Sequence, residues 1–396
     1  MSDMYERTLA QELRDRLAEP RRFIQIVVGP RQTGKTTAVG QALAGLAIPA
    51  HVASADDPTI LDLPWIQREW DAARLLQARF GGPAVLVIDE IQKIRAWSGM
   101  VKLLWDEDSR LGTPLLVVLT GSSPLLLQAG LTESLMGRFE VLYCPHWTYS
   151  ECAAAFGFSL NDFWYFGGYP GAASLRGDET RWARYIGSSI VEPTIAHDVL
   201  ALEDVRKPAL LRSLFVLGAT YSGQELSYTK IQGQLQEAGN TTTLAHYLTL
   251  LDQAGMVCGL PKYSGSALAT RQSSPRFMVH DTSLMTYAFG ASRARLLGDP
   301  TARGHLVESA VGAYLLARGR TEGFDVFYWR ERSQEVDFVV QNGTAVTAIE
   351  VKSGRAKPTH GSLAFMQAFP QARGLVVGGI NCPLEDFLSG RVALFG

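Results

Sequence analysis

The segment "FIQIVVGPRQTGKTTAV", residues 23–39, decides the fold of the N-terminal part of this 396-residue chain. Its apolar start predicts a strand, its centre a glycine-containing loop and its end a helix. From Gly29 to Thr36 it matches G-x-x-x-x-G-K-[ST], in which backbone N–H groups wrap phosphates, Lys35 reaches the β- and γ-phosphates and Thr36 ligates Mg²⁺. We therefore expect ATP and Mg²⁺ as cofactors, held by Gly29, Pro30, Arg31, Gln32, Thr33, Gly34, Lys35, Thr36 and Thr37.

A second segment, "PAVLVIDEIQKI" at residues 83–94, supplies a pair of carboxylates. The apolar run from Val85 to Ile88 predicts a strand that is buried on both faces. It ends in Asp89, which we expect to hold Mg²⁺ through water, and Glu90, which we expect to polarise the attacking water. With a phosphate-binding loop about fifty residues upstream, an acidic pair that is merely solvated is the weaker interpretation.

Two further positions follow from the next strand, "PLLVVLTGSSPLLL" at residues 114–127. In ATPases of the AAA type a polar residue at this strand end senses the γ-phosphate, and Ser122 is the candidate. The alternative is that these residues form a turn and a helix cap. Further along, Arg138 in "LMGRFEVLYCP" is either a surface residue or an arginine finger that reaches a neighbour's nucleotide in a ring.

Composition limits the class of protein. The length predicts two to four domains. The four cysteines (144, 152, 258, 382) show no C-x-x-C spacing, which favours a reduced cytoplasmic setting without a zinc site. Apolar runs are too short to span a bilayer. The net charge of −2 means that any contact with nucleic acid must come from a local patch.

The middle of the chain is predicted to be helical. Residues 151–205 are periodic and rich in aromatic side chains, and we interpret them as a small helical lid that follows the nucleotide-binding core. Residues 206–280 follow the order of a winged helix-turn-helix. A short helix ends near Glu237, Thr241–Thr243 cap a second helix with apolar face Leu244, Tyr247, Leu248 and Leu251, and an apolar strand follows.

The charge of this segment favours DNA without specifying a sequence. Between Arg206 and Phe277 there are seven basic residues and three acidic ones. Local positive charge supports phosphate contact. The exposed start of the second helix carries threonines and no arginine to read guanine, so sequence-specific readout is not expected. The alternative is a winged helix that packs protein against protein.

The C-terminal residues 281–396 predict an α-β-β-β-α-β order that ends in a second candidate site. A helix at residues 303–319 contains Glu308, and the strands "QEVDFVVQNG" and "AVTAIEVKSG" carry Asp337, Glu350 and Lys352. A hairpin would bring Asp337 towards Glu350, and carboxylates that converge repel unless they hold a cation such as Mg²⁺ or Mn²⁺.

This arrangement resembles the D…E-x-K site of restriction-endonuclease-like nucleases. Glu308, Asp337 and Glu350 would be metal ligands, Lys352 would orient water or neutralise a phosphate, and the chemistry would be metal-assisted hydrolysis of a phosphodiester. Two alternatives stay open: a surface ion pair between Glu350 and Lys352, or a nuclease relic that binds DNA or protein without cutting.

The ordered motifs "GPRQTGKTT", "VLVIDEIQK", "LTGSSP", "GRFEVLYCPHWTYSE", "FGGYPGAA", "SSPRFMVHDTSLM" and "EVDFVV…AIEVKSG" resemble those of a prokaryotic family that joins an N-terminal AAA domain to a C-terminal domain of unknown function 4143. The resemblance covers nearly the whole chain. It implies that Arg31 and Gln32 belong to the family's phosphate loop and that Arg138 is its Gly-Arg arginine. Gly171 departs from the acidic residue common after "GGYP", which leaves the role of residues 167–170 open.

Together these features predict an α/β protein with a P-loop AAA-type core (1–150), a helical lid (151–205), a winged helix (206–280) and a restriction-endonuclease-like domain (281–396). The expected function is an ATP-hydrolysing motor that acts on DNA, preferably branched or forked, as a homo-oligomer that could close into a ring. The alternatives are a regulatory NTPase switch with a protein-binding C-terminal module, or an ATP-regulated nuclease that depends on Mg²⁺.

Overall fold

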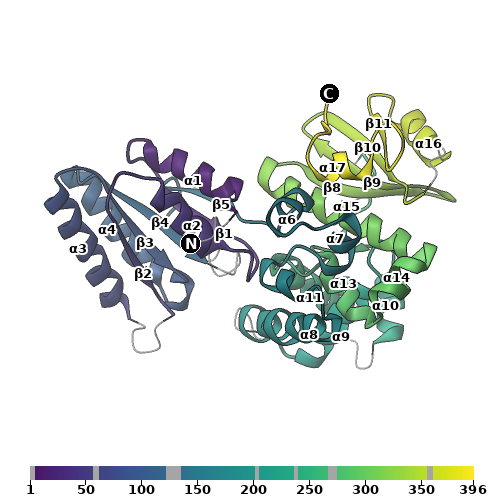
Figure 1. Cartoon of the computed structure of the whole chain (residues 1–396), viewed down its shortest axis with the longest axis horizontal. Coiled ribbons are helices and arrows are strands. Elements are labelled where there is room, and N and C mark those ends of the chain that lie inside the picture. The colour runs from purple at the N-terminus through teal and green to yellow at the C-terminus, as the bar shows by residue number, and fades with distance from the viewer. Residues whose placement is uncertain are drawn as a thin grey trace. The chain divides into compact units, whose positions relative to one another are not determined.

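The computed structural model describes residues 5–56, 62–121, 135–200, 205–235, 240–265, 274–354 and 360–396. It contains two compact units, Met1–Pro145 and His146–Gly396, and each is treated by itself. The fold is α/β, as predicted, with one parallel sheet in the first unit and many helices in the second (Figure 1). None of the helices within the described ranges has both the length and the apolarity needed to cross a membrane.

The first unit is a five-stranded parallel sheet in the order β2-β3-β4-β1-β5. Its strands are β1 (Ile24–Val28), β2 (Ala50–Ser54), β3 (Ala84–Asp89), β4 (Leu115–Gly121) and β5 (Phe139–Tyr143). Because all strands run the same way, their carboxyl ends meet at one edge, where α/β sheets bind ligands. The strands predicted within residues 83–94 and 114–127 are confirmed as β3 and β4.

Helices cover both faces of this sheet (Figure 1). They are α1 (Thr8–Ala18), α2 (Lys35–Ala44), α3 (Leu63–Phe80) and α4 (Trp97–Leu111), with a single turn η1 (Ile91–Lys93) after β3. Helices α1 and α2 share a core with one face of the sheet, and α3 and α4 share a core with the other. Burial on both faces explains why the central strands are continuously apolar in sequence.

The second unit begins with a group of short helices. They are α6 (Tyr149–Phe156), α7 (Leu160–Phe166), η2 (Pro170–Leu175), α8 (Glu179–Tyr185) and the π-helical η3 (Ile186–Val191) and η4 (Thr194–Val199). The sequence predicted these residues as a lid of the nucleotide-binding core, but the structure groups them with the second unit. The reason is packing: the hydroxyls of Thr282 and Thr286 donate to the Phe163 and Tyr165 carbonyls at 3.0 and 2.7 Å, and so join α7 to α13 (Thr282–Phe289).

The motif "GGYP" belongs to the same junction. A Cβ atom on Gly167 would lie 1.9 Å from Oδ1 of Asp281, and one on Gly168 would lie 2.2 Å from the Trp147 carbonyl oxygen. Gly168 instead donates its N–H to Asp281 Oδ2 at 2.7 Å. Residues 167 and 168 are therefore glycines because the chain passes a buried carboxylate too closely for any side chain.

Three helices and a hairpin occupy residues 208–279. They are α9 (Pro208–Thr220), α10 (Tyr228–Gln234), α11 (Thr241–Gln253) and the antiparallel strands β6 (Val257–Leu260) and β7 (Arg276–Val279). The four predicted apolar side chains of α11 are buried. Asn240, rather than a threonine, caps this helix by accepting from the Thr243 N–H at 2.8 Å. Glu237, near the predicted end of the preceding helix, lies outside the described residues.

The C-terminal part has the predicted α-β-β-β-α-β order. Its elements are α14 (Arg293–Gly298), α15 (Pro300–Glu322), β8 (Asp325–Glu331), β9 (Gln334–Asn342), β10 (Ala345–Val351), α16 (His360–Ala368), β11 (Arg373–Val377) and α17 (Leu384–Leu388). The sheet order is β11-β10-β9-β8, with β9 and β10 paired as the predicted hairpin and β10 parallel to β11. The hairpin turns at Gly343, whose φ of 57° favours glycine.

Candidate functional site

The phosphate loop lies between the end of β1 and the start of α2. A Cβ atom on Gly29 would lie 2.1 Å from the carbonyl oxygen of Cys144, which follows β5, so the close approach of these chain segments requires glycine. Gly34 has a φ of 91° and directly precedes α2. The loop therefore ends at the N-terminus of α2, and helix N-termini bind anions.

Lys35 is buried, and its ammonium group is held by the loop itself. Nζ donates to the carbonyl oxygens of Gly29 at 3.0 Å and Pro30 at 2.7 Å. Thr33 closes the same turn by donating its hydroxyl to the Pro30 carbonyl at 3.0 Å. The cation is thus already placed at the concave side of the loop.

Asp89 joins the loop to the central strands. The Thr36 hydroxyl donates to Asp89 Oδ2 at 3.0 Å, and the backbone N–H of Glu90 donates to Oδ1 at 3.1 Å. Thr120, at the end of β4, donates its hydroxyl to the same Oδ1. The structure therefore brings together the predicted Thr36 and Asp89, and it adds Thr120, which the sequence motifs did not single out although it lies in the strand end that contains Ser122.

Glu90 takes up an unusual backbone conformation. Its φ of 54° is in the left-handed region, and its Oε2 accepts from the Gln92 side chain at 2.5 Å. Both features fix the direction in which the carboxylate leaves the strand end. Ser122, the candidate γ-phosphate sensor, lies outside the described residues.

An open pocket of roughly 300 Å³ collects these groups. Its lining consists of Arg31, Gln32, Gly34, Lys35, Thr36, Thr37, Asp56, Asp89, Glu90 and Lys93. Asp56 forms an ion pair with Lys93. Three features fit a nucleoside triphosphate with Mg²⁺: the glycine at position 29, the buried ammonium group of Lys35 and the hydrogen bond between Thr36 and Asp89.

Arg7 supports this pocket from the N-terminal side. Its buried guanidinium donates to the carbonyl oxygens of Thr33 at 3.0 Å and Pro145 at 3.1 Å, and so ties the phosphate loop to the end of β5. No sequence motif marks this role, because it depends on two contacts that are distant along the chain.

Arg138 lies at the amino ends of the parallel strands, whereas the phosphate loop lies at their carboxyl ends. It precedes β5, whose first residue, Phe139, pairs with Ile24 at the start of β1, whereas the loop follows the end of β1. Its guanidinium is held by Asp106 of α4 at 2.7 and 3.1 Å. Arg138 is therefore remote from the nucleotide pocket of its own chain.

The predicted site in the second unit is built around an arginine. Arg276 of β7 is buried, and its guanidinium contacts Glu308 of α15, Glu335 of β9 at 2.8 Å and Asp337 of β9 at 3.9 Å. It also donates to the Gly223 carbonyl at 2.9 Å. Arg276 is one of the seven basic residues counted between Arg206 and Phe277, but these carboxylates offset its charge, so it adds little to a positive surface.

The remaining members of the predicted metal site lie beside this cluster. Asp337 accepts from the Val351 N–H at 2.7 Å. Glu350 is buried, accepts from the Ser362 N–H at 3.0 Å and pairs with Lys352 at 3.3 Å. An open pocket of roughly 350 Å³ is lined by Glu335, Asp337, Glu350 and Lys352, together with Ser333, Gln334 and Gly361.

These carboxylates fit a bound cation less well than the sequence suggested. Within the described ranges, the ligand atoms of Glu308, Asp337 and Glu350 do not lie within 4.8 Å of one another as a set. Burial raises the pKa of Glu308 to about 8, against the effect of the nearby Arg276 guanidinium. Burial also raises the pKa of Asp337. Arg276 thus supplies positive charge where the sequence predicted a metal ion.

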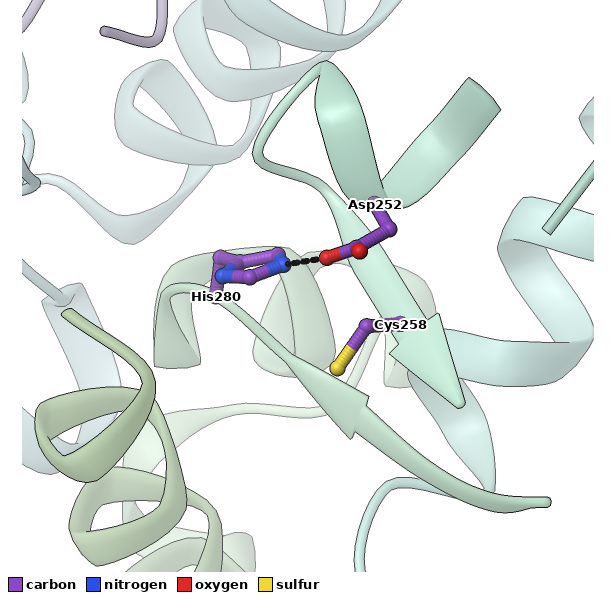
Figure 2. A group of neighbouring side chains, drawn as sticks. All are labelled: Asp252, Cys258 and His280. Atoms are coloured by element: carbon purple, nitrogen blue, oxygen red, sulfur yellow. Dashed lines mark hydrogen bonds and ion pairs between the residues drawn. The ribbon is translucent and has the colours of Figure 1, made fainter. Parts of the chain in front are cut away.

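A second cluster of potential metal ligands contains the buried Cys258 and His280 and the partly exposed Asp252 (Figure 2). Asp252 near the end of α11, Cys258 of β6 and His280 after β7 are the one set of three potential ligands in the described residues whose atoms lie within 4.8 Å. His280 Nε2 lies 2.7 Å from Asp252 Oδ1, and Arg320 Nη2 of α15 lies 2.6 Å from the same oxygen. The carboxylate therefore already has a cation, and the set links α11 and β7 to α15.

Comparisons with known proteins match three successive parts of the chain. Residues 21–153 match the AAA domain family, residues 157–295 a domain of unknown function (DUF8612) and residues 303–385 a domain of unknown function (DUF4143). Uncharacterized proteins of Mycobacterium tuberculosis and Mycobacterium bovis are each 27% identical over 356 residues, which is 86% of this chain and 74% of theirs.

Among solved structures, the Walker-type ATPase PABY2304 of Pyrococcus abyssi is similar with a TM-score of 0.53. It is 14% identical, and the match covers 72% of this chain and 96% of that one, which shows a shared fold. The chain thus matches an AAA domain at its N-terminus and DUF4143 at its C-terminus, which is the domain layout of the family that its sequence motifs resemble.

Proposed function

We propose that the chain is an ATP-hydrolysing motor that acts on DNA, with branched or forked DNA as its preferred substrate. The observation that carries the ATPase part is the hydrogen bond between Thr36 and Asp89, because it joins the two predicted Mg²⁺-binding positions. The pocket beside it contains the buried Lys35 and the carboxylate of Glu90.

Each group has a definite task in this proposal. Thr36 and Asp89 would hold Mg²⁺, which offsets the negative charge of the phosphates when bound. Lys35 and the N-terminus of α2 bind the phosphates. Glu90 orients a water molecule and accepts its proton. Arg138, held by Asp106 away from its own pocket, acts on the nucleotide of a neighbouring copy in a homo-oligomer.

The arrangement of α9, α10, α11 and the β6–β7 hairpin supports a DNA partner, since this order is that of a winged helix. The exposed start of α11 offers threonines and no arginine. A module without base-reading side chains can still select DNA by shape, which favours forks and junctions over a defined sequence.

The C-terminal domain holds DNA without cutting it in the conformation described. Arg276 pairs with Glu308, Glu335 and Asp337. These carboxylates are therefore not arranged to hold the metal ion that hydrolysis of a phosphodiester would need. Plasmid and fork DNA incubated with Mg²⁺ or Mn²⁺ should therefore stay intact. Cutting that is lost in Lys352→Ala would establish the nuclease alternative instead.

The main experiment measures the ATPase rate with duplex, forked and four-way junction DNA. We expect the largest stimulation from fork or junction DNA. Lys35→Ala should abolish nucleotide binding, whereas Glu90→Gln should bind ATP without turnover, so the pair separates binding from hydrolysis. Hydrolysis that no DNA stimulates, in a chain that does not bind DNA at low salt, would instead support the regulatory switch.

A further inference from the structure

A groove of roughly 420 Å³ lies in the second unit, on a surface that the nucleotide pocket does not use. Its described lining is Glu225, Ser227, Lys230, Lys262, Ser274, Arg330 and Arg332. Four of these side chains are basic and one is acidic, and the acid, Glu225, pairs with Arg330 at 3.3 Å. The groove therefore carries a net positive charge in a chain whose net charge is −2.

The walls of this groove come from separate elements that are firmly joined. Tyr263 N–H donates to the Tyr328 carbonyl at 2.7 Å, and Tyr328 N–H donates to the Pro261 carbonyl at 3.1 Å, so the residues that directly follow β6 pair with β8. The Tyr328 hydroxyl donates to the Ser274 carbonyl at 2.7 Å. The basic side chains of the hairpin and of β8 are thus held at fixed separations before a partner arrives.

We propose that this groove binds the phosphate backbone of duplex DNA, which rests on the DNA role proposed above. Lysine and arginine side chains neutralise phosphates, and serine hydroxyls donate to phosphate oxygens. The described lining contains no apolar side chain for a peptide anchor and no aromatic ring on which an unpaired base would stack. A duplex, which presents a continuous row of phosphates, fits these groups best.

The second helix of the winged helix does not offer an equivalent surface. The segment from Thr241 to Gln253 contains no lysine or arginine. Basic groups instead stand on α10, after β6 and at the β8–β9 turn, so the groove, and not the start of α11, takes the duplex.

The groove also leads towards the carboxylate pocket. Arg330 of β8 lies opposite Glu335 of β9 in the antiparallel ladder, and Glu335 lines the pocket that contains Lys352. Ser333 and Gln334, which directly follow Arg332, line the same pocket. A backbone that follows the groove past this turn would bring its next phosphates to Lys352.

The test compares two triple variants of the full chain. The groove variant is Lys230→Gln, Lys262→Gln and Arg332→Gln. The control variant removes three exposed arginines of the same unit, Arg181→Gln, Arg184→Gln and Arg295→Gln. Equal thermal unfolding midpoints establish that both variants are folded. Fluorescence anisotropy with a labelled duplex is then measured over a series of salt concentrations.

We expect the groove variant to bind at least ten-fold more weakly than the control. The slope of log K against log salt should fall by about 0.9 for each phosphate that the variant no longer neutralises. Equal affinities and slopes in the two variants, with a wild-type chain that binds duplex, would overturn the groove assignment and leave the DNA role intact. A wild-type chain that binds no DNA at low salt would overturn both.

Two further arms identify the occupant. Single-stranded DNA of the same sequence should bind wild type more weakly than the duplex does. If single-stranded DNA binds wild type more tightly than the duplex, and the groove variant loses that binding, the duplex assignment is overturned. Polyglutamate at equal charge concentration should fail to displace the duplex. Efficient displacement would show that the groove receives an acidic protein segment instead.

Discussion

Arg276 Nη1 lies 2.8 Å from Oε1 of Glu335, so a strand of the β6–β7 hairpin supplies the cation for carboxylates of the C-terminal sheet. Removal of the guanidinium in Arg276→Met would leave Glu308, Glu335 and Asp337 together without a counter-charge. Breaking a buried pair in this way costs about 3–5 kcal/mol. We expect a marked fall in the thermal unfolding midpoint of the second unit.

Glu308→Gln provides the matched comparison for that variant. Because Glu335 and Asp337 still contact Arg276 in this variant, and burial already raises the pKa of Glu308, the neutral glutamine should cost less than the loss of Arg276. The double variant Arg276→Met, Glu308→Gln should recover part of the lost stability. An unchanged midpoint in Arg276→Met would show that the arginine is not the counter-charge of the cluster.

Thr36→Ala and Asp89→Asn test the nucleotide site. Each removes one partner of the 3.0 Å hydrogen bond, and loss of Mg²⁺ placement should reduce the ATPase rate about 100-fold or more. Thr36→Ser keeps the hydroxyl and should retain most of the rate. Steady-state phosphate release at saturating ATP measures the effect, and a Thr36→Ala chain as fast as wild type would contradict the assignment.

Arg138 can be tested by mixing two inactive proteins. Arg138→Ala retains its own pocket but lacks the finger, whereas Glu90→Gln retains Arg138 but cannot hydrolyse ATP. If Arg138 acts on a neighbouring copy, mixed oligomers contain sites with both groups, and ATPase activity should reappear on mixing. Asp106→Asn, which releases Arg138 from its ion pair, serves as a control for effects on folding. Mixtures that stay inactive, although the chains assemble, would exclude the finger.

The stability of the second unit should depend on pH through Asp281. Burial raises its pKa to about 6 against hydrogen bonds from Gly168 and Ser283. A raised carboxyl pKa stabilises the fold fully below the unfolded value near 4, and this contribution is lost as pH rises through 6. Between pH 5 and 7.5 the stability advantage of wild type over Asp281→Asn should therefore shrink by about 1.4 kcal/mol.

Chemical denaturation at several pH values measures this difference. Asp325→Asn, at an exposed carboxylate, is the control for the Asp→Asn substitution itself. A gap between wild type and Asp281→Asn that is constant, or that widens with pH, would contradict the raised pKa.

The parts of this protein that could be predicted from its sequence are those encoded locally. The phosphate loop, the Asp89 strand end and the β9–β10 hairpin each occupy one short segment, and the structure places them as expected. Arg276 could not be interpreted this way: three carboxylates from two elements of the C-terminal domain surround it. Likewise, the aromatic helices after residue 150 look like a lid until their packing against α13 is seen.

The residues that directly follow β6 pair with β8, and Arg276 of β7 is buried among carboxylates of the C-terminal domain. Both contacts limit where the two matched domains can be separated. The border between residues 295 and 303 looks suitable for gene fusion, because two family matches end and begin there. A chimera joined at that border would contain Arg276 without its three carboxylate partners, or these carboxylates without Arg276. An expression fragment that ends near residue 295 would lack all three carboxylates that contact Arg276, and we expect it to be less stable than the intact second unit.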